Sequence, residues 1–287
     1  MNKWLIGARV KTLPAAISPV LIGTSYAQDI NWINAALALV VALFLQIAVN
    51  YANDYSDGIK GTDSNRVGPT RLVASGLASA RAVKNASYFC FLIAAFAGSI
   101  LSLSISKWLF VIGALSILAA WGYTGGRKPY GYLGFGEVSV FVFFGLIATI
   151  GSYYIQSKEI NWQIFLLSIP VGCLSCAVLV INNLRDLSND KLVGKRTLAV
   201  LLGDKKTRNF YTVLLVVSQL ISVIAAVVNI RMLFTLICIP IMINAIKKVS
   251  LGAKGIELIP ILGRTARLQL LLAVITAAAL FNWNGIK

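Results

Sequence analysis

The 287-residue sequence contains no histidine and only ten acidic residues, and charged residues make up 13% of the chain. Without histidine, Ser-His-Asp catalysis, HExxH zinc sites and imidazole acid–base chemistry are excluded. A soluble domain carries about a quarter charged residues, whereas 58% of this chain is hydrophobic. The composition therefore predicts an integral membrane protein of a single domain spanning 1–287.

Lysine and arginine outnumber the acidic residues by 26 to 10, which gives a formal net charge of +16. In a soluble protein this excess would indicate nucleic acid as a partner. In a membrane protein, basic residues mark the cytoplasmic loops, so we expect the lipid bilayer as a partner and no nucleic acid. Of four cysteines, Cys173 and Cys176 have CxxC spacing, but without histidine or a second pair they are interpreted as buried small residues.

Nine apolar segments are long enough to be membrane helices, since a bilayer core of about 30 Å requires about 20 residues per helix. The first segment contains Pro14 and Pro19, which membrane helices tolerate. We therefore predict an all-α bundle of nine transmembrane helices in two related halves, roughly 1–130 and 131–287, around a central cavity open to the cytoplasm. The segments are 12–28, 34–53, 86–104, 108–125, 132–154, 162–183, 209–228, 231–249 and 267–283.

The basic residues agree with this count when the N-terminus is placed in the cytoplasm. Of the 26, 22 then lie in cytoplasmic segments, and Lys107, Lys158, Arg231 and Lys287 lie outside. This asymmetry follows the positive-inside rule. It predicts a multi-pass protein of the cell inner or plasma membrane with a cytoplasmic N-terminus, an outside C-terminus and an active site that faces the cytoplasm.

Two groups of amides and carboxylates follow predicted spans, each at a cytoplasmic end. Their spacings of three, four, seven and eight residues place each group on one helix face. Because like charges repel there, and a helix C-terminus disfavours anions, a neutralising cation is expected. Oxygen ligands without histidine or cysteine favour Mg²⁺, and we expect two ions bound by Asp54, Asp57, Asp186 and Asp190. The amides are Asn50 and Asn53 in the first group and Asn182 in the second.

Both acidic helices run from outside to inside, so their acidic ends should lie on the same membrane face. Carboxylates, Mg²⁺ and basic side chains together bind diphosphates, and nine surrounding helices favour a lipid chain on that diphosphate. Positive-inside anchoring explains each individual basic residue equally well. The basic candidates are Lys60, Arg66, Arg71, Arg185, Lys191, Lys195 and Arg196.

The motifs Asn53–Asp57 and Asp186–Asp190 resemble the two aspartate motifs of the UbiA-type membrane prenyltransferases. The resemblance covers almost the whole chain. Within the family, the sequence is most similar to the 1,4-dihydroxy-2-naphthoate polyprenyltransferases of menaquinone synthesis. The sequence departs from the broader pattern at Gly61, where a third aspartate is common; Asp63 comes two residues later. Val10 replaces a common proline. The four matching stretches are Ala8–Ala15, Ala52–Asp63, Tyr123–Gly134 and Asn182–Ala199.

The resemblance implies Mg²⁺-dependent transfer of a polyprenyl group from polyprenyl diphosphate to an aromatic acid acceptor, 1,4-dihydroxy-2-naphthoate. CO2 and diphosphate would leave, and demethylmenaquinone would form. Asp54, Asp57, Asp186, Asp190 and Lys195 would be catalytic, and the amides and remaining basic residues would bind diphosphate. The expected pocket for the acceptor and the allylic cation is formed by Tyr51, Tyr55, Tyr123, Arg127, Lys128, Tyr130, Tyr132 and Glu137.

Two alternatives stay open from the sequence. Another aromatic acceptor, such as 4-hydroxybenzoate, would use the same site. A cation-coupled secondary transporter would also place acids in a helical bundle, but it would hold them near the bilayer midplane with water access from both sides. Glu137 is interpreted either as a proton acceptor or as a partner of Arg127.

Overall fold

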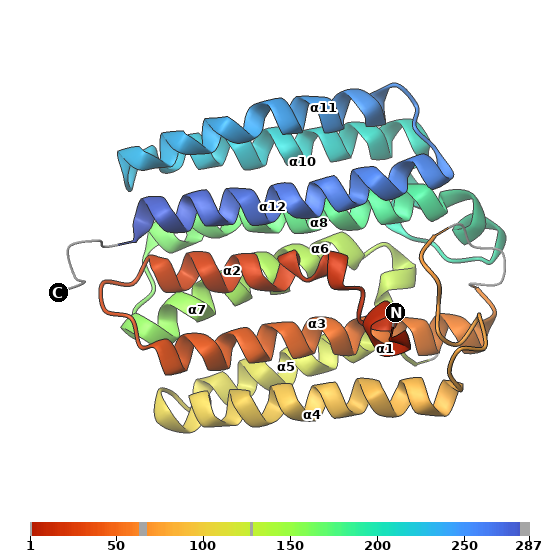
Figure 1. Ribbon diagram of the computed structural model, residues 1–287, viewed down its shortest axis with the longest axis horizontal. Coiled ribbons are helices and arrows are strands. Elements are labelled where there is room, and N and C mark those ends of the chain that lie inside the picture. Colours follow the sequence, from red (N-terminus) through yellow and green to blue (C-terminus); the bar gives the residue numbers. More distant parts are fainter. Residues whose placement is uncertain (1, 63–67, 127–128, 282–287) are drawn as a thin grey trace.

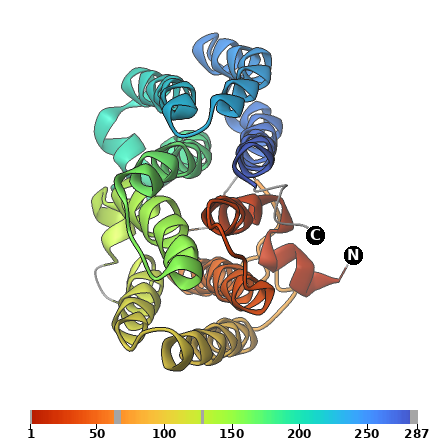
Figure 2. The same ribbon diagram turned by 90° about the vertical axis from the view of Figure 1, so that its left-hand side faces the viewer.

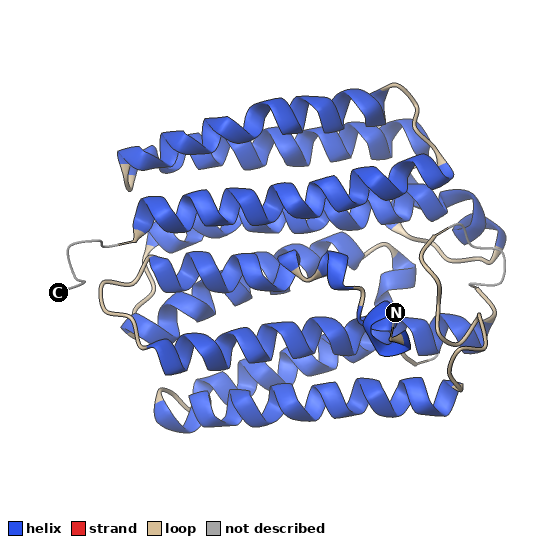
Figure 3. Cartoon of the chain, viewed as in Figure 1, coloured by secondary structure: helices blue, strands red, loops and turns tan. Residues whose placement is uncertain are grey.

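The computed structural model describes residues 2–62, 68–126 and 129–281, and these ranges contain helices and connecting segments but no strand (Figure 3). The described helices therefore confirm the all-α prediction. The first part contains α1 (Lys3–Ala8), η1 (Val10–Thr12), α2 (Pro14–Ser25), α3 (Trp32–Lys60), α4 (Ala80–Ser104) and α5 (Trp108–Gly122). The second contains η2 (Tyr130–Leu133), α6 (Gly136–Val140), η3 (Phe141–Ile147), α7 (Ala148–Ser157), α8 (Trp162–Leu192), α9 (Leu198–Leu202), α10 (Asp204–Ile224), η4 (Ala225–Val227), η5 (Ile230–Cys238), α11 (Ile239–Ser250), η6 (Gly255–Glu257) and α12 (Leu258–Leu280).

Each of the nine predicted spans coincides with a helical segment. In the described part of the chain, seven segments are long and apolar enough to cross a membrane, as expected of a multi-pass membrane protein. The N-terminal pair Lys3–Thr12 and Pro14–Ser25, bent by 52°, gives an eighth if it is one span. Trp108–Gly122 is apolar but has only 15 residues, so the count of nine stays a prediction.

The ends of the two long acidic helices are set by local sequence. The side chain of Asn31 caps α3 by accepting hydrogen bonds from the amides of Ile33 and Asn34, at 3.0 and 3.1 Å. The helix continues to Gly61, which ends it with a left-handed φ of 69°. Such a residue at a helix end is typically glycine because it has no Cβ. α8 begins after the cap Asn161 and runs for 31 residues.

The long helices run nearly side by side, as Figure 1 shows, and Figure 2 shows them end-on. Helix α7 contacts α2, and the preceding segment η3 contacts α8, at glycine residues that allow close approach. A Cβ added to Gly23 of α2 would lie 2.3 Å from the carbonyl oxygen of Thr149, and one added to Gly145 would lie 2.6 Å from Cα of Gly172. Small residues of this kind allow membrane helices to approach closely.

The ends of α3 and α8 lie at the same end of the bundle, on the right in Figure 1. A hydrogen bond of 2.9 Å joins them, from the Asn189 amide to the carbonyl oxygen of Thr62. The loop 68–79 and the segment after α8 lie at this end too. Consequently, residues separated by more than 120 positions in the sequence meet in one place.

Candidate active site

A cavity of about 770 Å³ lies inside the bundle. Most of its wall is apolar and comes from α2, α3, α5, the 136–157 helix and α8, with residues such as Leu45, Leu109, Phe143 and Val178. Its polar wall residues come largely from the end where α3 and α8 meet. The cavity therefore combines a long apolar compartment with one charged end. The polar wall residues at that end are Arg9, Lys11, Asn50, Asn53, Asp57, Arg71, Asn182, Asn183, Arg185, Asp186 and Lys195.

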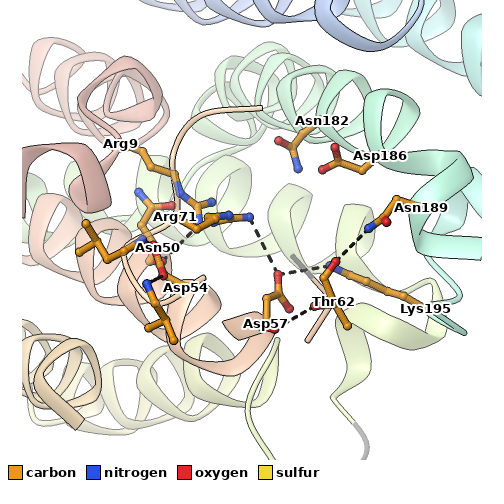
Figure 4. A network of polar contacts seen from close by, with 12 residues as sticks. Arg9, Asn50, Asp54, Asp57, Thr62, Arg71, Asn182, Asp186, Asn189 and Lys195 are labelled. Carbon is orange, nitrogen blue, oxygen red and sulfur yellow. Dashed lines mark hydrogen bonds and ion pairs between the residues drawn. The ribbon is translucent and has the colours of Figure 1, made fainter. Parts of the chain in front are cut away.

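Asn50, Asn53 and Asp57 line the cavity from α3, as their helical spacing predicts. Asp57 is 3% exposed and lies between two cations, with its carboxylate 3.9 Å from Arg71 and 3.6 Å from Lys195 (Figure 4). It also accepts a hydrogen bond from the Tyr132 hydroxyl. The Oδ1 atom of Asn53 is buried and has no hydrogen-bond partner among the described residues.

Asp54 faces the loop 68–79 and not the cavity. Its two carboxylate oxygens accept hydrogen bonds from the backbone amides of Leu72 and Val73, at 2.9 and 3.0 Å. The residue is 1% exposed and is not part of the cavity wall. Consecutive helical residues point about 100° apart, and the loop 68–79 packs on the side to which Asp54 points. In this geometry Asp54 anchors the loop that carries Arg71.

On α8, Asn182 and Asp186 line the cavity opposite Asp57 (Figure 4). Arg185 holds Asp186 through both carboxylate oxygens, at 2.8 and 2.7 Å, and donates to the Asn182 Oδ1 at 2.8 Å. Asp190 is 5% exposed and lies one turn further on, outside the cavity wall. Its backbone carbonyl accepts from the amide of Lys195 at 2.8 Å, which turns the chain back towards Asp57.

No group of three Asp, Glu, Cys or His side chains in the described ranges is arranged to hold a metal ion. The cavity wall instead offers separate oxygen donors, the Asp57 and Asp186 carboxylates and the Asn53 Oδ1. Oxygen donors of this kind suit Mg²⁺, which usually binds one or two carboxylates together with phosphate oxygens. These residues therefore fit an ion that is bound jointly by protein and a phosphate ligand.

The predicted basic residues differ in their positions relative to the cavity. Arg71, Arg185 and Lys195 line the cavity. Lys60 donates to the Thr124 carbonyl oxygen at 3.2 Å and lies 4.7 Å from the centre of the Tyr132 ring. Two further candidates, Lys191 and Arg196, have exposed side chains outside the wall. Arg66, Arg127, Lys128 and Asp63 lie outside the described residues.

The tyrosines are not equivalent either. Tyr123 and Tyr130 line the cavity. Tyr51 instead donates a 2.8 Å hydrogen bond to the Trp4 carbonyl oxygen, and neither it nor Tyr55 belongs to the wall. The Tyr132 ring lies under Lys60 and Lys195.

The predicted pocket residue Glu137 is 4% exposed and lies behind the cavity wall. Its Oε1 accepts a 2.9 Å hydrogen bond from the Asn183 amide, which does line the cavity. Asn183 was not among the residues that the sequence singled out as a ligand. Its position directly after Asn182 was a sequence signal that could have identified it as a residue of the site.

Arg9 and Lys11 also line the cavity, although neither is among the basic residues predicted for the site. Arg9 adopts a left-handed backbone with φ of 51°, which turns α1 away from α2. Its guanidinium donates to the Asn50 carbonyl oxygen at 3.4 Å, and the Asn50 amide donates to the Ala8 carbonyl oxygen at 2.9 Å. The only sequence signal for this arrangement was the matching stretch Ala8–Ala15.

These features define a class of protein: a helical membrane bundle with an apolar cavity. The carboxylates, amides and cations at one end of the cavity suit an anionic lipid. Residues 16–253 match the UbiA prenyltransferase family. The chain belongs to this family.

Curated relatives resemble the chain over nearly its full length. The 1,4-dihydroxy-2-naphthoate octaprenyltransferase of Mycobacterium tuberculosis is 46% identical over 97% of this chain and 96% of the relative. The protein of the same name from Escherichia coli is 34% identical over 97% of this chain and 94% of the relative. A solved UbiA homologue from Archaeoglobus fulgidus, bound to DMAPP and Mg²⁺, has the same fold, with a TM-score of 0.70 at 13% identity over 97% and 99% of the two chains.

Proposed function

We propose that this protein transfers a polyprenyl group from polyprenyl diphosphate to 1,4-dihydroxy-2-naphthoate, with release of diphosphate and CO2, in menaquinone synthesis. The observation that carries the proposal is the single cavity, which joins a long apolar compartment to a charged end built from α3 and α8. The names of the M. tuberculosis and E. coli relatives support the choice of acceptor.

The diphosphate would bind at the charged end, where Arg71, Arg185 and Lys195 line the wall. These cations are fixed by contacts within the protein before the substrate arrives: Lys195 and Arg71 lie near Asp57, and Arg185 is bonded to Asp186. Fixed charges that face a developing anion are usually the largest contribution to catalysis. They would stabilise the diphosphate as the allylic C–O bond breaks.

Mg²⁺ is supported by the donor set of this chain and by the ligands of the A. fulgidus homologue. Asn53, Asp57 and Asp186 would hold it, because their oxygens belong to the cavity wall. When bound, Mg²⁺ neutralises diphosphate oxygens and makes diphosphate a better leaving group. The sequence also predicts two ions, with Asp54 and Asp190 as further ligands. The contacts of Asp54 with the loop 68–79 favour a structural role for it instead, and the Asp54→Asn variant decides between the two roles.

The prenyl chain would extend into the apolar compartment, whose wall keeps water away from the allylic cation. Tyr123 and Tyr130 present neutral aromatic rings beside the charged end, and a ring face stabilises a nearby cation by about 0.5–2 kcal/mol. The naphthoate carbon that bears the carboxylate would then form the new C–C bond, and the bond to the carboxyl group would break to release CO2. Arg9 and Lys11 are placed in the wall where they could bind that carboxylate.

We further propose that residues 1–287 act as one catalytic unit with related halves, 1–130 and 131–287. The matching Asn and Asp positions on α3 and α8 support this division. The location would be the cell inner or plasma membrane, with the N-terminus and the charged end of the cavity on the cytoplasmic side. The distribution of the basic residues supports this orientation.

The test is turnover by the purified protein in detergent, with Mg²⁺, geranyl diphosphate and a panel of aromatic acids, followed by mass analysis of the products. The expected product is prenylated naphthalenediol that has lost CO2. Prenylated 4-hydroxybenzoate without a naphthoate product would change the acceptor. Absence of any product from folded protein, with cation flux in vesicles, would support the transporter alternative.

A further inference from the structure

A buried polar pair lies beside the cavity and has no part in the chemistry described above. Glu137 and Asn183 are 4% and 6% exposed and are joined by the 2.9 Å hydrogen bond from the Asn183 Nδ2 to the Glu137 Oε1. The second carboxylate oxygen of Glu137 is buried without a hydrogen-bond partner among the described residues. The Cys176 thiol donates to the Glu137 backbone carbonyl at 3.0 Å, which ties this turn of the 136–157 helix to α8.

The pair fixes the direction in which the Asn183 amide points. An asparagine amide has a donating and an accepting end, and the donating end of Asn183, Nδ2, is bonded to the Glu137 Oε1. Because Glu137 receives the donating end, the accepting oxygen must point the other way. Asn183 lines the cavity, and its oxygen forms no hydrogen bond with a described residue. The wall therefore presents one oriented acceptor to whatever fills the cavity.

The height of Asn183 on α8 places this acceptor near the reacting atoms. Asn183 precedes Asp186 by three residues, which corresponds to about 4.5 Å along the helix axis. It thus lies about one turn further from the C-terminal end of α8 than Asp186, on the side of the charged end that borders the apolar compartment. The Tyr123 ring also lines the cavity and lies close to Gly136, the neighbour of Glu137. A group bound against Asn183 would lie where the diphosphate end and the prenyl chain meet.

We propose that Asn183 accepts a hydrogen bond from the 4-hydroxyl of the aromatic acceptor and that Glu137 is the positioning residue that holds Asn183 in this orientation. The proposal rests on the proposed function. The 1-hydroxyl of 1,4-dihydroxy-2-naphthoate is adjacent to the carboxylate and forms an internal hydrogen bond with it. The 4-hydroxyl has no such partner and must find one in a site that excludes water. Asn183 would therefore select for acids that carry a hydroxyl at this position.

The test compares two acids that differ only in this hydroxyl. The Michaelis constant for the dihydroxynaphthoate acceptor is measured together with the inhibition constant for a competing acid, 1-hydroxy-2-naphthoate. In the wild-type protein the acid without the 4-hydroxyl should bind about tenfold more weakly, the effect of one missing hydrogen bond. In Asn183→Leu the two constants should come within about twofold of each other. The Michaelis constant for the prenyl diphosphate should be unchanged.

Two further variants separate orientation from packing. Glu137→Gln keeps an oxygen that accepts from Asn183 and should keep the discrimination, whereas Glu137→Leu should lose it. Asn34→Leu is the matched control, because Asn34 is not part of the cavity wall and lies in the first turn of α3, at the opposite end of this helix from Asp57. It should keep the wild-type ratio. The ratio does not depend on the fraction of folded protein, so a partly unstable variant still gives an answer.

The outcomes distinguish this proposal from the proposed function. If the wild-type protein does not prenylate 1,4-dihydroxy-2-naphthoate, the proposed function is wrong. If it does, and Asn183→Leu retains the wild-type ratio of the two constants, Asn183 does not accept a hydrogen bond from the 4-hydroxyl. This inference is then overturned. Equal loss of discrimination in Glu137→Gln and Glu137→Leu would overturn the positioning role of Glu137.

Discussion

Asp54 and Asp57 are separated by three residues, yet the structure predicts opposite consequences for the same substitution. The Asp57 carboxylate lies in the cavity wall near Arg71 and Lys195. The Asp54 carboxylate accepts from two backbone amides of the loop 68–79. Asp57→Asn should therefore change catalysis, and Asp54→Asn should mainly change stability.

The magnitudes follow from these contacts. A hydrogen bond to a charged group contributes about 1.5–3 kcal/mol. In Asp54→Asn one side-chain oxygen is replaced by an amide donor, which would face the backbone N–H of Leu72 or Val73, so one bond is lost and the unfolding free energy should fall by about 1.5–3 kcal/mol. In Asp57→Asn a fixed charge at the reacting end is lost, and kcat should fall about 100- to 1,000-fold.

The assay measures both quantities for each variant: the apparent melting temperature in detergent, and initial rates at saturating Mg²⁺ and substrates, corrected for folded protein. Asp29→Asn is the matched control, since Asp29 is exposed in the loop between α2 and α3 at the other end of the bundle. It should have wild-type stability and rate. If Asp54→Asn melts like the wild type but has no turnover, Asp54 is a metal ligand and the assignment of roles made from this structure is refuted.

Three further predictions follow from contacts at the site and in the bundle. Chelation of divalent ions should remove turnover without unfolding the protein, and added Mg²⁺ should restore it; turnover that persists in excess EDTA would contradict the metal assignment. Lys195→Gln should lower kcat about 10- to 100-fold with little change in the KM for the aromatic acid, because Lys195 lies at the diphosphate end; an unchanged kcat would show that it only anchors the loop. Gly145→Ala should destabilise the protein by about 1–3 kcal/mol, measured by thermal unfolding, since the new Cβ would lie 2.6 Å from the Gly172 Cα. Gly263→Ala is its control, because a Cβ there would have open space.

The positions of the helices were predictable because they depend on local sequence. Long apolar runs define each segment, and the alternation of basic residues fixes which ends lie together. From these two signals the sequence predicts that the ends of α3 and α8 meet, and the hydrogen bond between Asn189 and Thr62 lies where they do. The sequence analysis placed Pro14 inside the first span and did not predict α1 or the bend of 52° that follows it, because α1 is too short to be a span and packs on α3.

The sequence could not predict which polar side chains line the cavity and which contact the loop 68–79, because segments distant in sequence determine this. Helical spacing places Asn50, Asn53, Asp54 and Asp57 on one broad face, and nothing local distinguishes the two carboxylates. The loop 68–79 makes the distinction when it covers Asp54 with its amides. In the same way, Arg9 enters the wall only because α1 folds back on α3.

The charges around the cavity explain why the described carboxylates do not form a metal site alone. The described wall contains five basic side chains, Arg9, Lys11, Arg71, Arg185 and Lys195, but only two acidic ones, Asp57 and Asp186. Both carboxylates already face cations, so this end attracts anions more strongly than a free divalent ion. A diphosphate reverses this, because it satisfies the cations and supplies the oxygens that Mg²⁺ requires. The ion and the lipid diphosphate should therefore bind together, with the diphosphate supplying the metal ligands that the described wall lacks.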